Sequence, residues 1–152
     1  MELRRATDED LPALVAMLAD DPLGAGRETL DGDLAPYRRA FALVDADPAH
    51  VLLVALEGEE VVGTLQLSVL PGLARRGALR GQIEAVRVAA GARGRGIGAA
   101  MVGWAVEESR RRGCSLVQLT TDKSRTDARR FYERLGFEAG HEGMKLALSG
   151  DS

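Results

Sequence analysis

The chain has 152 residues and a formal net charge of −3, with 45% hydrophobic and 28% charged residues. This length and composition are typical of one globular domain, which we expect over residues 1–152. The negative charge argues against nucleic acid as the main partner, and no apolar run approaches the length of a membrane span. With one cysteine, Cys114, and no signal-peptide pattern, we expect a cytoplasmic protein without internal disulfides or a membrane partner.

The first third of the chain predicts one short strand and two helices. Residues 2–5 form the strand, and Thr7 and Asp10 then fit a capping box that begins a helix. The apolar face of this helix would consist of Leu11, Leu14, Val15 and Leu18. After a loop rich in glycine and aspartate, Asp33 is placed to cap a second helix. The buried face of the second helix would consist of Leu34, Tyr37, Phe41 and Val44.

The middle of the chain predicts a pair of strands. Residues 51–56 form an unbroken apolar run, which is typical of a central strand, and residues 57–60 form a hairpin turn. Residues 61–70 then alternate between apolar and polar side chains until Pro71 ends the strand. A hairpin therefore precedes the most informative stretch of the chain.

A strand, a glycine-rich turn and a helix follow one another from Ile83 onward. Residues 83–88 predict the strand, and residues 91–98 contain four glycines and two arginines. Apolar residues then recur at helical spacing up to Arg112. Glycines let the backbone approach a ligand, and the N–H groups and dipole of a helix N-terminus favour negative charge. The stretch therefore predicts a phosphate or pyrophosphate site.

Two other kinds of glycine-rich turn fit this stretch less well. A P-loop needs Lys and then Ser or Thr after its last glycine, whereas Ala99 and Ala100 follow Gly98. The pattern Gly94-x-Gly96-x-x-Ala99 fits a dinucleotide fingerprint loosely. In a dinucleotide-dependent oxidoreductase we would expect such a turn in an early strand–helix unit. Here the glycines lie late in the chain, which argues against that class of enzyme.

The last third of the chain predicts a strand, a helix and two closing strands. Ser124 and Asp127 fit a cap for the helix. Gly136 ends it, and Phe137 can pack back as in a Schellman motif. The strands of this region would be residues 115–121, 137–140 and 144–148.

Together these elements predict an α/β (α+β) fold with six to seven strands in one sheet and about four helices on its faces. The hairpin favours antiparallel neighbours, and the strand–helix crossovers between residues 82 and 137 add parallel ones. We therefore expect a mixed, mainly antiparallel sheet.

Two motifs resemble the signatures of the GNAT superfamily of N-acetyltransferases. The first is Arg93-x-x-Gly96-x-Gly98, which has the form of that family's pyrophosphate loop for coenzyme A. The second is ARRFYERLGF at residues 128–137, which stands one strand after the pyrophosphate helix, where that family has it. The order of the predicted elements also agrees, so the resemblance implies a GNAT-like fold.

The resemblance implies acetyl-CoA as the co-substrate and a way of holding it. Backbone groups of residues 86–88 would pair with the pantetheine arm like an added strand, and the glycine turn would hold the pyrophosphate. The family often has Asn where this chain has Arg125, so Arg125 would reach a phosphate instead. The implied cofactor-binding residues are Val86, Arg87, Val88, Arg93, Gly94, Arg95, Gly96, Ile97, Gly98, Ala99 and Arg125. We expect no metal, because no metal-ligand spacing is present.

Glu84 is the candidate general base. An amine is cationic at neutral pH and must lose a proton before it attacks a carbonyl carbon. In a regular strand Glu84 would share a face with Val86 and Val88, and apolar neighbours suit a carboxylate that accepts a proton. The alternative is an edge glutamate paired with Arg80 or Arg87.

Tyr132 is the candidate general acid, because the resemblance implies a position near the thioester sulfur. The alternative is a core aromatic with a bonded hydroxyl. Thr120 and Thr121 end a strand beside the expected cleft, where they would either contact the acceptor or bond to backbone. Cys114 is expected to be a small core residue, and His50 and His141 are expected at the surface.

We therefore predict an acetyl-CoA-dependent N-acetyltransferase that acts on a primary amine by direct attack in a ternary complex. A CoA-binding regulatory module without catalysis and a dinucleotide-dependent oxidoreductase are the alternatives. The acceptor would be a small-molecule amine or a peptide, and a homodimer is compatible with the sequence. Acidic residues between positions 20 and 33 would either attract a cationic acceptor or be solvated loop residues. The arginines that favour a carboxylate-bearing acceptor are Arg38, Arg39, Arg75 and Arg76.

Overall fold

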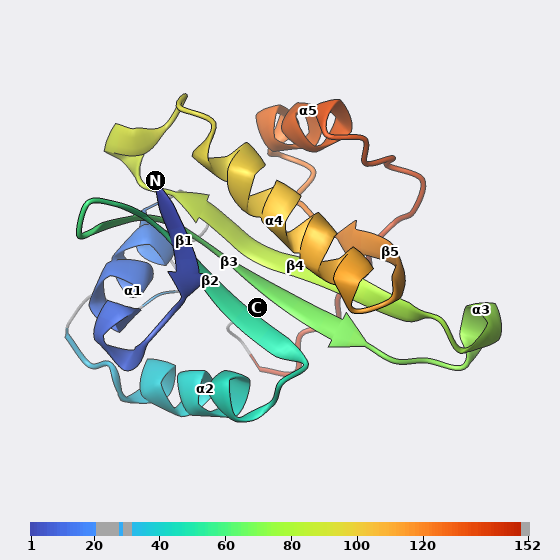
Figure 1. Ribbon diagram of the computed structural model, residues 1–152, viewed down its shortest axis with the longest axis horizontal. Coiled ribbons are helices and arrows are strands. Elements are labelled where there is room, and N and C mark those ends of the chain that lie inside the picture. The colour runs from blue at the N-terminus through green and yellow to red at the C-terminus, as the bar shows by residue number, and fades with distance from the viewer. Residues whose placement is uncertain (21–27, 29–31, 150–152) are drawn as a thin grey trace. The chain divides into compact units, whose positions relative to one another are not determined.

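The computed structural model describes residues 1–20, 28 and 32–149 (Figure 1). The chain forms two compact units, Met1–Gln118 and Leu119–Ser152. Within the described residues, no helix is both long and apolar enough to cross a membrane. The expectation of one domain stays a prediction.

The first unit is built on one sheet. Its strands are β1 Glu2–Arg5, β2 His50–Glu57, β3 Glu60–Leu70, β4 Leu79–Val88 and β5 Cys114–Leu119. They lie in the order β1-β2-β3-β4-β5, and the pairs from β1 to β4 are antiparallel (Figure 1). A crossover helix leads from β4 to β5, which makes the sheet mixed. The predicted mixed, mainly antiparallel sheet is confirmed, but it has five strands rather than six or seven.

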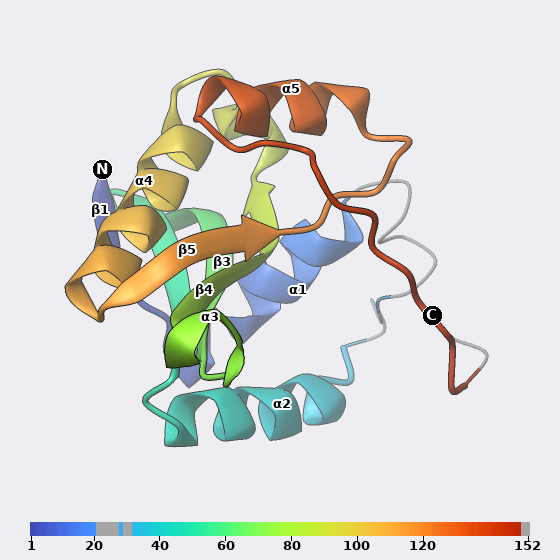
Figure 2. The ribbon, with the colours of Figure 1, turned by 90° about the vertical axis from the view of Figure 1, so that its right-hand side faces the viewer.

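Helices cover both faces of this sheet. Those of the first unit are α1 Leu11–Ala19, α2 Ala35–Ala46, the short α3 Ala74–Gly77 and α4 Ile97–Arg111. Figure 2 shows α4 on one side of the sheet and α1 on the other. α4 packs mainly on β3 and β4, and α2 packs on β2. All the helices predicted for this part of the chain are confirmed.

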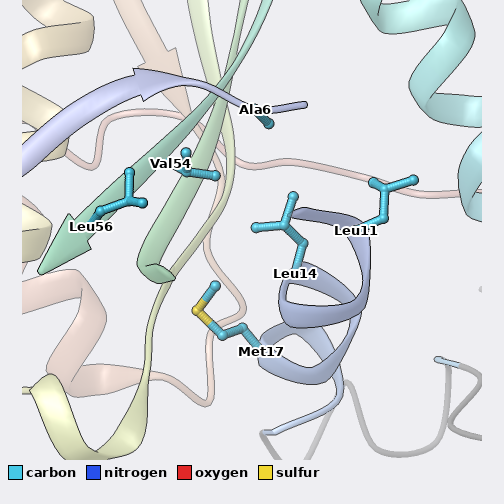
Figure 3. Close-up of a cluster of buried hydrophobic side chains, with 6 residues drawn as sticks. All are labelled: Ala6, Leu11, Leu14, Met17, Val54 and Leu56. Carbon is cyan, nitrogen blue, oxygen red and sulfur yellow. The ribbon is translucent and has the colours of Figure 1, made fainter. Parts of the chain in front are cut away.

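An apolar cluster joins α1 to β2 (Figure 3). Leu14 and Met17 of α1 point toward Val54 and Leu56 of β2, and all four side chains are buried. Phe41 of α2 packs against this cluster but stays half-buried. Leu11, Leu14 and Val15 of the predicted apolar face of α1 are buried, but Leu18 is only half-buried. α2 is less buried than predicted.

The entrance to α1 is fixed by polar contacts around Asp10. The Thr7 N–H donates to Asp10 Oδ2 at 2.7 Å, as the predicted capping box requires. Arg4 adds two hydrogen bonds to the same carboxylate, at 2.8 and 3.0 Å. These contacts, with that of the Arg4 guanidinium largest, hold the pKa of Asp10 below its usual value. The turn from β1 into α1 is thereby closed by charge as well as by packing.

Two glycines of the sheet face α4. A Cβ on Gly63 of β3 would approach Met101 Cε to 2.9 Å, and a Cβ on Gly81 of β4 would collide with Ser109 Oγ. Ser109 is itself buried and donates to Ala105 O at 2.7 Å. A side chain at either position would require Met101 or Ser109 of α4 to shift.

The second unit contains α5, Thr126–Arg134. The helix closes as predicted: Gly136 has φ of 99°, and the Phe137 N–H donates to Tyr132 O at 3.1 Å. The predicted cap at Ser124 is wrong, because Arg125 is the N-cap residue. Ser124 instead donates through its hydroxyl to Asp122 Oδ1 at 2.6 Å.

The two predicted closing strands are absent from the described residues, since residues 137–140 and 144–148 form no strand. Met144, Leu146 and Leu148 alternate as a strand would, but their side chains are exposed. A strand needs a hydrogen-bonded neighbour, and alternation alone does not supply one. This accounts for the smaller sheet.

The C-terminal end of α4 carries a compact ion-pair network. Glu108, 12% exposed, accepts hydrogen bonds from Arg111 Nε at 3.0 Å and from Arg112 Nε at 2.8 Å. Arg112 also donates to Pro48 O at 2.7 Å and so ties the helix to the start of β2. Mainly through the hydrogen bonds from Arg111, and then those from Arg112, the pKa of Glu108 falls to about 2 from an ordinary value of 4.5.

Replacing Glu108 with Gln should remove stability that depends on pH. Because the pKa is lower in the folded state, the contribution is present above about pH 4.5 and disappears as the pH falls toward 2. Glu108→Gln should therefore lower the free energy of unfolding by about 1.5–3 kcal/mol at neutral pH. The difference from the unsubstituted protein should shrink steadily below about pH 4.5, which urea denaturation across a pH series would measure.

Glu107→Gln is the matched control. Glu107 pairs with Arg110, and both side chains are largely exposed. Exposed pairs contribute little, so this variant should match the unsubstituted protein at every pH. Equal losses in the two variants would contradict the assignment to Glu108.

Candidate active site

The glycine-rich turn lies between β4 and α4, as the sequence predicts (Figure 1). Gly94 and Gly96 have φ of 82° and 78°, and Gly96 is the N-cap residue of α4. No atom lies within 4 Å of the position that a Cβ would take at either glycine. The turn thus presents open backbone beside the positive end of a 15-residue helix, a donor set that fits a pyrophosphate.

Both arginines of the turn make contacts with nearby chain. Arg93 Nε donates to Val88 O at 3.2 Å. Arg95 donates to Gly91 O at 3.1 Å and pairs with Glu57, also at 3.1 Å. A cavity of about 330 Å³ adjoins Arg95. Both side chains are exposed, so a phosphate at the turn would find two guanidinium groups within reach.

A β-bulge interrupts β4 next to Glu84. Thr64 of β3 pairs with Arg87 and Gln66 pairs with Glu84, so the single residue between them faces two residues of β4. One of those two, Ala85, has φ of 54°, which is uncommon for a residue other than glycine. The bulge shifts the alternation of side chains along β4 by one position.

The bulge overturns the predicted surroundings of Glu84. Val88 pairs with Gly63, which faces α4, so Val88 and Val86 lie on the α4 side of the sheet. Glu84 lies on the other side, together with Arg87. Its side chain is exposed and accepts a hydrogen bond from Gln82 Nε2 at 2.5 Å. The expectation of apolar neighbours on the same face is wrong, although the carboxylate remains accessible for proton transfer.

β4 extends past the end of β5. Ser115 Oγ donates to Leu79 O and Gln118 Nε2 to Gln82 Oε1, and both pairs are 36 positions apart in the sequence. This register brings Leu119, the last residue of β5, level with Ile83. No residue of β5 therefore pairs with the part of β4 that follows the bulge.

In the part of β4 that follows the bulge, the backbone N–H and C=O groups of alternate residues point away from β3. Ala89 donates its N–H to Val62 O at 2.8 Å, and Arg87 pairs with Thr64. Alternation then turns the backbone groups of Val86 and Val88 to the opposite edge. This edge of β4 can accept an extended ligand, as predicted for residues 86–88.

Sequence reasoning missed a chain of side-chain amides that ends at Glu84. Gln118 Nε2 donates to Gln82 Oε1 at 2.9 Å, and Gln82 Nε2 donates in turn to Glu84. Residues 80, 82 and 84 alternate along β4, and this spacing alone indicates that they share one face. The link to Gln118 also depends on the register between β4 and β5.

His50, expected at the surface, is half-buried and bonds to Ser68 Oγ at 2.8 Å.

The remaining predicted site residues, Tyr132 and Arg125, belong to the second unit. The ring of Tyr132 is half-buried and makes edge contacts with Phe131 and Phe137, at centroid distances of 5.0 and 5.8 Å. Arg125 begins α5 as its N-cap residue.

In the first unit, burial raises the pKa of the half-buried Cys114 thiol, which fits the expected packing role.

The sequence matches the model of the acetyltransferase (GNAT) family over residues 11–137. The chain belongs to this family. It is 34% identical over 149 residues to the aminoalkylphosphonate N-acetyltransferase of Salmonella typhimurium, covering 97% of this chain and 91% of that one. It is 32% identical over 151 residues to the glucosamine 6-phosphate N-acetyltransferase of Trypanosoma brucei brucei, covering 97% and 96%.

Among solved structures, the fold resembles that of a transcriptional regulator from Bacillus halodurans C-125. The TM-score is 0.94 at 50% identity, and the match covers 97% of this chain and 99% of that one. Family membership and the two relatives make this GNAT chain an N-acetyltransferase, an enzyme that transfers an acetyl group to an amine. The dinucleotide-dependent oxidoreductase is thereby excluded.

Proposed function

We propose that this GNAT enzyme transfers the acetyl group of acetyl-CoA to a small primary amine by direct attack in a ternary complex. The observation that carries the proposal is the order of three features along β4 and the turn that follows it. An exposed carboxylate at the bulge is followed by a strand edge beyond the end of β5 and then by a glycine turn at a helix N-terminus. These features suit, in turn, an amine, a pantetheine arm and a pyrophosphate.

Acetyl-CoA supplies an acetyl group activated as a thioester. The backbone of Val86, Arg87 and Val88 would hold the pantetheine arm, and the N–H of Val88 would donate to the carbonyl oxygen as charge develops on it. The residues that would hold the pyrophosphate are Arg93, Gly94, Arg95, Gly96, Ile97, Gly98 and Ala99, with Arg125 reaching a phosphate. Their open backbone and two exposed guanidinium groups support this assignment.

Glu84 would act as the general base and Tyr132 as the general acid. Glu84 takes the proton of the amine directly or through water, and its exposure supports both routes. A tyrosine is protonated at neutral pH and so can donate to a departing thiolate. Tyr132 lies in the motif that resembles the second GNAT signature, and this supports the assignment.

A small-molecule amine is the acceptor that the relatives support. By their names, one acts on an aminoalkylphosphonate and the other on glucosamine 6-phosphate. Each is a compact amine with an anionic group. A peptide acceptor is the alternative, and acetylation assays with both kinds of amine distinguish them.

Gly96→Glu should abolish binding of CoA. The substitution adds a side chain where the backbone must approach the ligand, at a φ of 78°, and brings a negative charge to a phosphate site. Calorimetry with CoA measures the effect. Gly113→Glu is the matched control, since Gly113 has φ of 84° and follows the other end of α4, and among the described residues beyond its chain neighbours no atom lies within 4 Å of its Cβ position. Equal CoA affinity in the Gly96 variant would remove the site assignment.

Glu84→Gln should lower kcat/KM by about 10²–10⁴ while CoA still binds. The acidic limb of the pH–rate profile should change with it, because the group that must be deprotonated is gone. Glu59→Gln, in the exposed hairpin turn between β2 and β3, controls for the loss of one charge. A Glu84 variant with the unsubstituted rate and profile would assign proton removal to another group or to solvent.

Tyr132→Phe should reduce kcat and leave the melting temperature and acetyl-CoA binding almost unchanged. The ring contacts with Phe131 and Phe137 survive, and only the hydroxyl proton is lost. The loss should be largest with weakly reactive amines, if thiolate departure then limits the rate. Tyr37→Phe removes the other tyrosine hydroxyl, on α2, and should not affect kcat. Unchanged kcat in the Tyr132 variant across several amines would make Tyr132 a packing residue.

A further inference from the structure

Three side chains of β4 form a row on the sheet face opposite α4. Gly81 and Ile83 are buried, and a Cβ at Gly81 would meet Ser109 of α4. The residues between and beside them, Arg80, Gln82 and Glu84, therefore point to the other face. The row begins at the N-terminal part of β4 and ends at the bulge.

The face of the sheet that carries this row presents apolar residues on β2 but amides on β3 and β4. On β2 the same face presents Leu52 and Val54, which pack with the α1 cluster. On β3 and β4 it presents Gln66 and Gln82, both half-buried. Core packing does not call for amides, whereas a polar ligand lying on this face would use them.

Arg80 stands out among the arginines of the first unit. It is half-buried, yet within the described part of the chain it donates no hydrogen bond and lies beside no carboxylate. Arg4 and Arg95, by contrast, each pair with a carboxylate at 2.8 and 3.1 Å. A half-buried guanidinium without a counter-charge is suited to an anionic ligand.

The proposed direction of acetyl-CoA decides where the acceptor lies. The glycine turn follows the C-terminal end of β4, so the pantetheine arm would run back toward the bulge. An amine at Glu84 must then extend the rest of its structure toward the N-terminal end of the strand. Arg80 lies four residues in that direction, or about 13 Å between Cα atoms in an extended strand. Arg80 Nη2 lies 3.9 Å from the position that a Cβ would take at Gly72, so the guanidinium would have to turn toward Glu84 to shorten that span.

We propose that Arg80 binds an oxyanion of the acceptor, so that the preferred substrates are short primary amines carrying a phosphonate or phosphate group. Glu84 and Arg80 then recognise the two charged ends of one molecule, and Gln82 lies between them. The inference rests on the proposed function, because it assumes that the amine meets Glu84. It assigns the substrate class to a residue that takes no part in proton transfer.

The test compares 2-aminoethylphosphonate with ethanolamine, its neutral counterpart, in steady-state acetylation. The unsubstituted enzyme should prefer the phosphonate. Arg80→Met keeps the apolar stem but removes the charge, and should raise KM for the phosphonate about 10- to 100-fold. KM for acetyl-CoA and the rate with ethanolamine should not change. Arg80→Lys should retain part of the preference, because it keeps the charge without the planar fork.

Arg5→Met is the matched control. Arg5 is exposed on β1, and its loss changes the net charge equally. It should leave the phosphonate preference intact. An equal effect of the two arginine substitutions would show that overall positive charge, rather than one residue, attracts the phosphonate, and would overturn the proposal. Equal losses with both amines in Arg80→Met would overturn it as well.

A binding measurement separates this inference from the proposed function. Calorimetry with 2-hydroxyethylphosphonate in the presence of CoA requires no turnover. Binding to the unsubstituted protein that is lost in Arg80→Met supports the oxyanion site even if no amine is acetylated. Absence of binding, or equal binding by both proteins, overturns it even if acetylation proceeds.

Discussion

The bulge in β4 determines how the candidate site is arranged. Ile83 before it and Val88 after it both lie on the α4 side of the sheet, although an odd number of positions separates them. A regular strand cannot do this, so the extra residue at Ala85 is required. Its positive φ costs about 1–2 kcal/mol, which the packing of α4 on both sides of the bulge must offset. The result is that Glu84 and Arg87 share the opposite face.

α4 connects the bulged strand to the anion-binding turn. Its N-terminus begins at the turn, and Ser109 in its last turn lies against Gly81 near the start of β4. Arg112 then ties its C-terminal end to Pro48, at the start of β2. The distance between the turn and Glu84 is thus held by one rigid helix packed on one strand. Preorganisation of this kind is what a reaction between two bound substrates requires.

Local patterns in the sequence predicted the parts of the molecule that local physics determines. The Thr7 cap, the turn at Gly96 and the closure of α5 at Gly136 each depend on residues within a few positions. The bulge was not predictable in this way, because it reflects the demand that α4 makes on both halves of β4. The closing strands failed for the same reason: Met144 and its alternating neighbours satisfy a local pattern, but pairing depends on a distant partner.

The edge of β4 beyond the end of β5 already accepts hydrogen bonds from two arginine side chains. Val86 O accepts from Arg87 at 2.9 Å, and Val88 O accepts from Arg93 at 3.2 Å. In the proposed complex, an amide of the pantetheine arm would replace Arg93 at Val88, so that hydrogen bond is exchanged rather than gained. The released guanidinium would lie next to the turn, where a pyrophosphate offers it a stronger, charge-assisted bond. Binding energy would then come mainly from the turn, while pairing along β4 sets how far the acetyl group reaches toward Glu84.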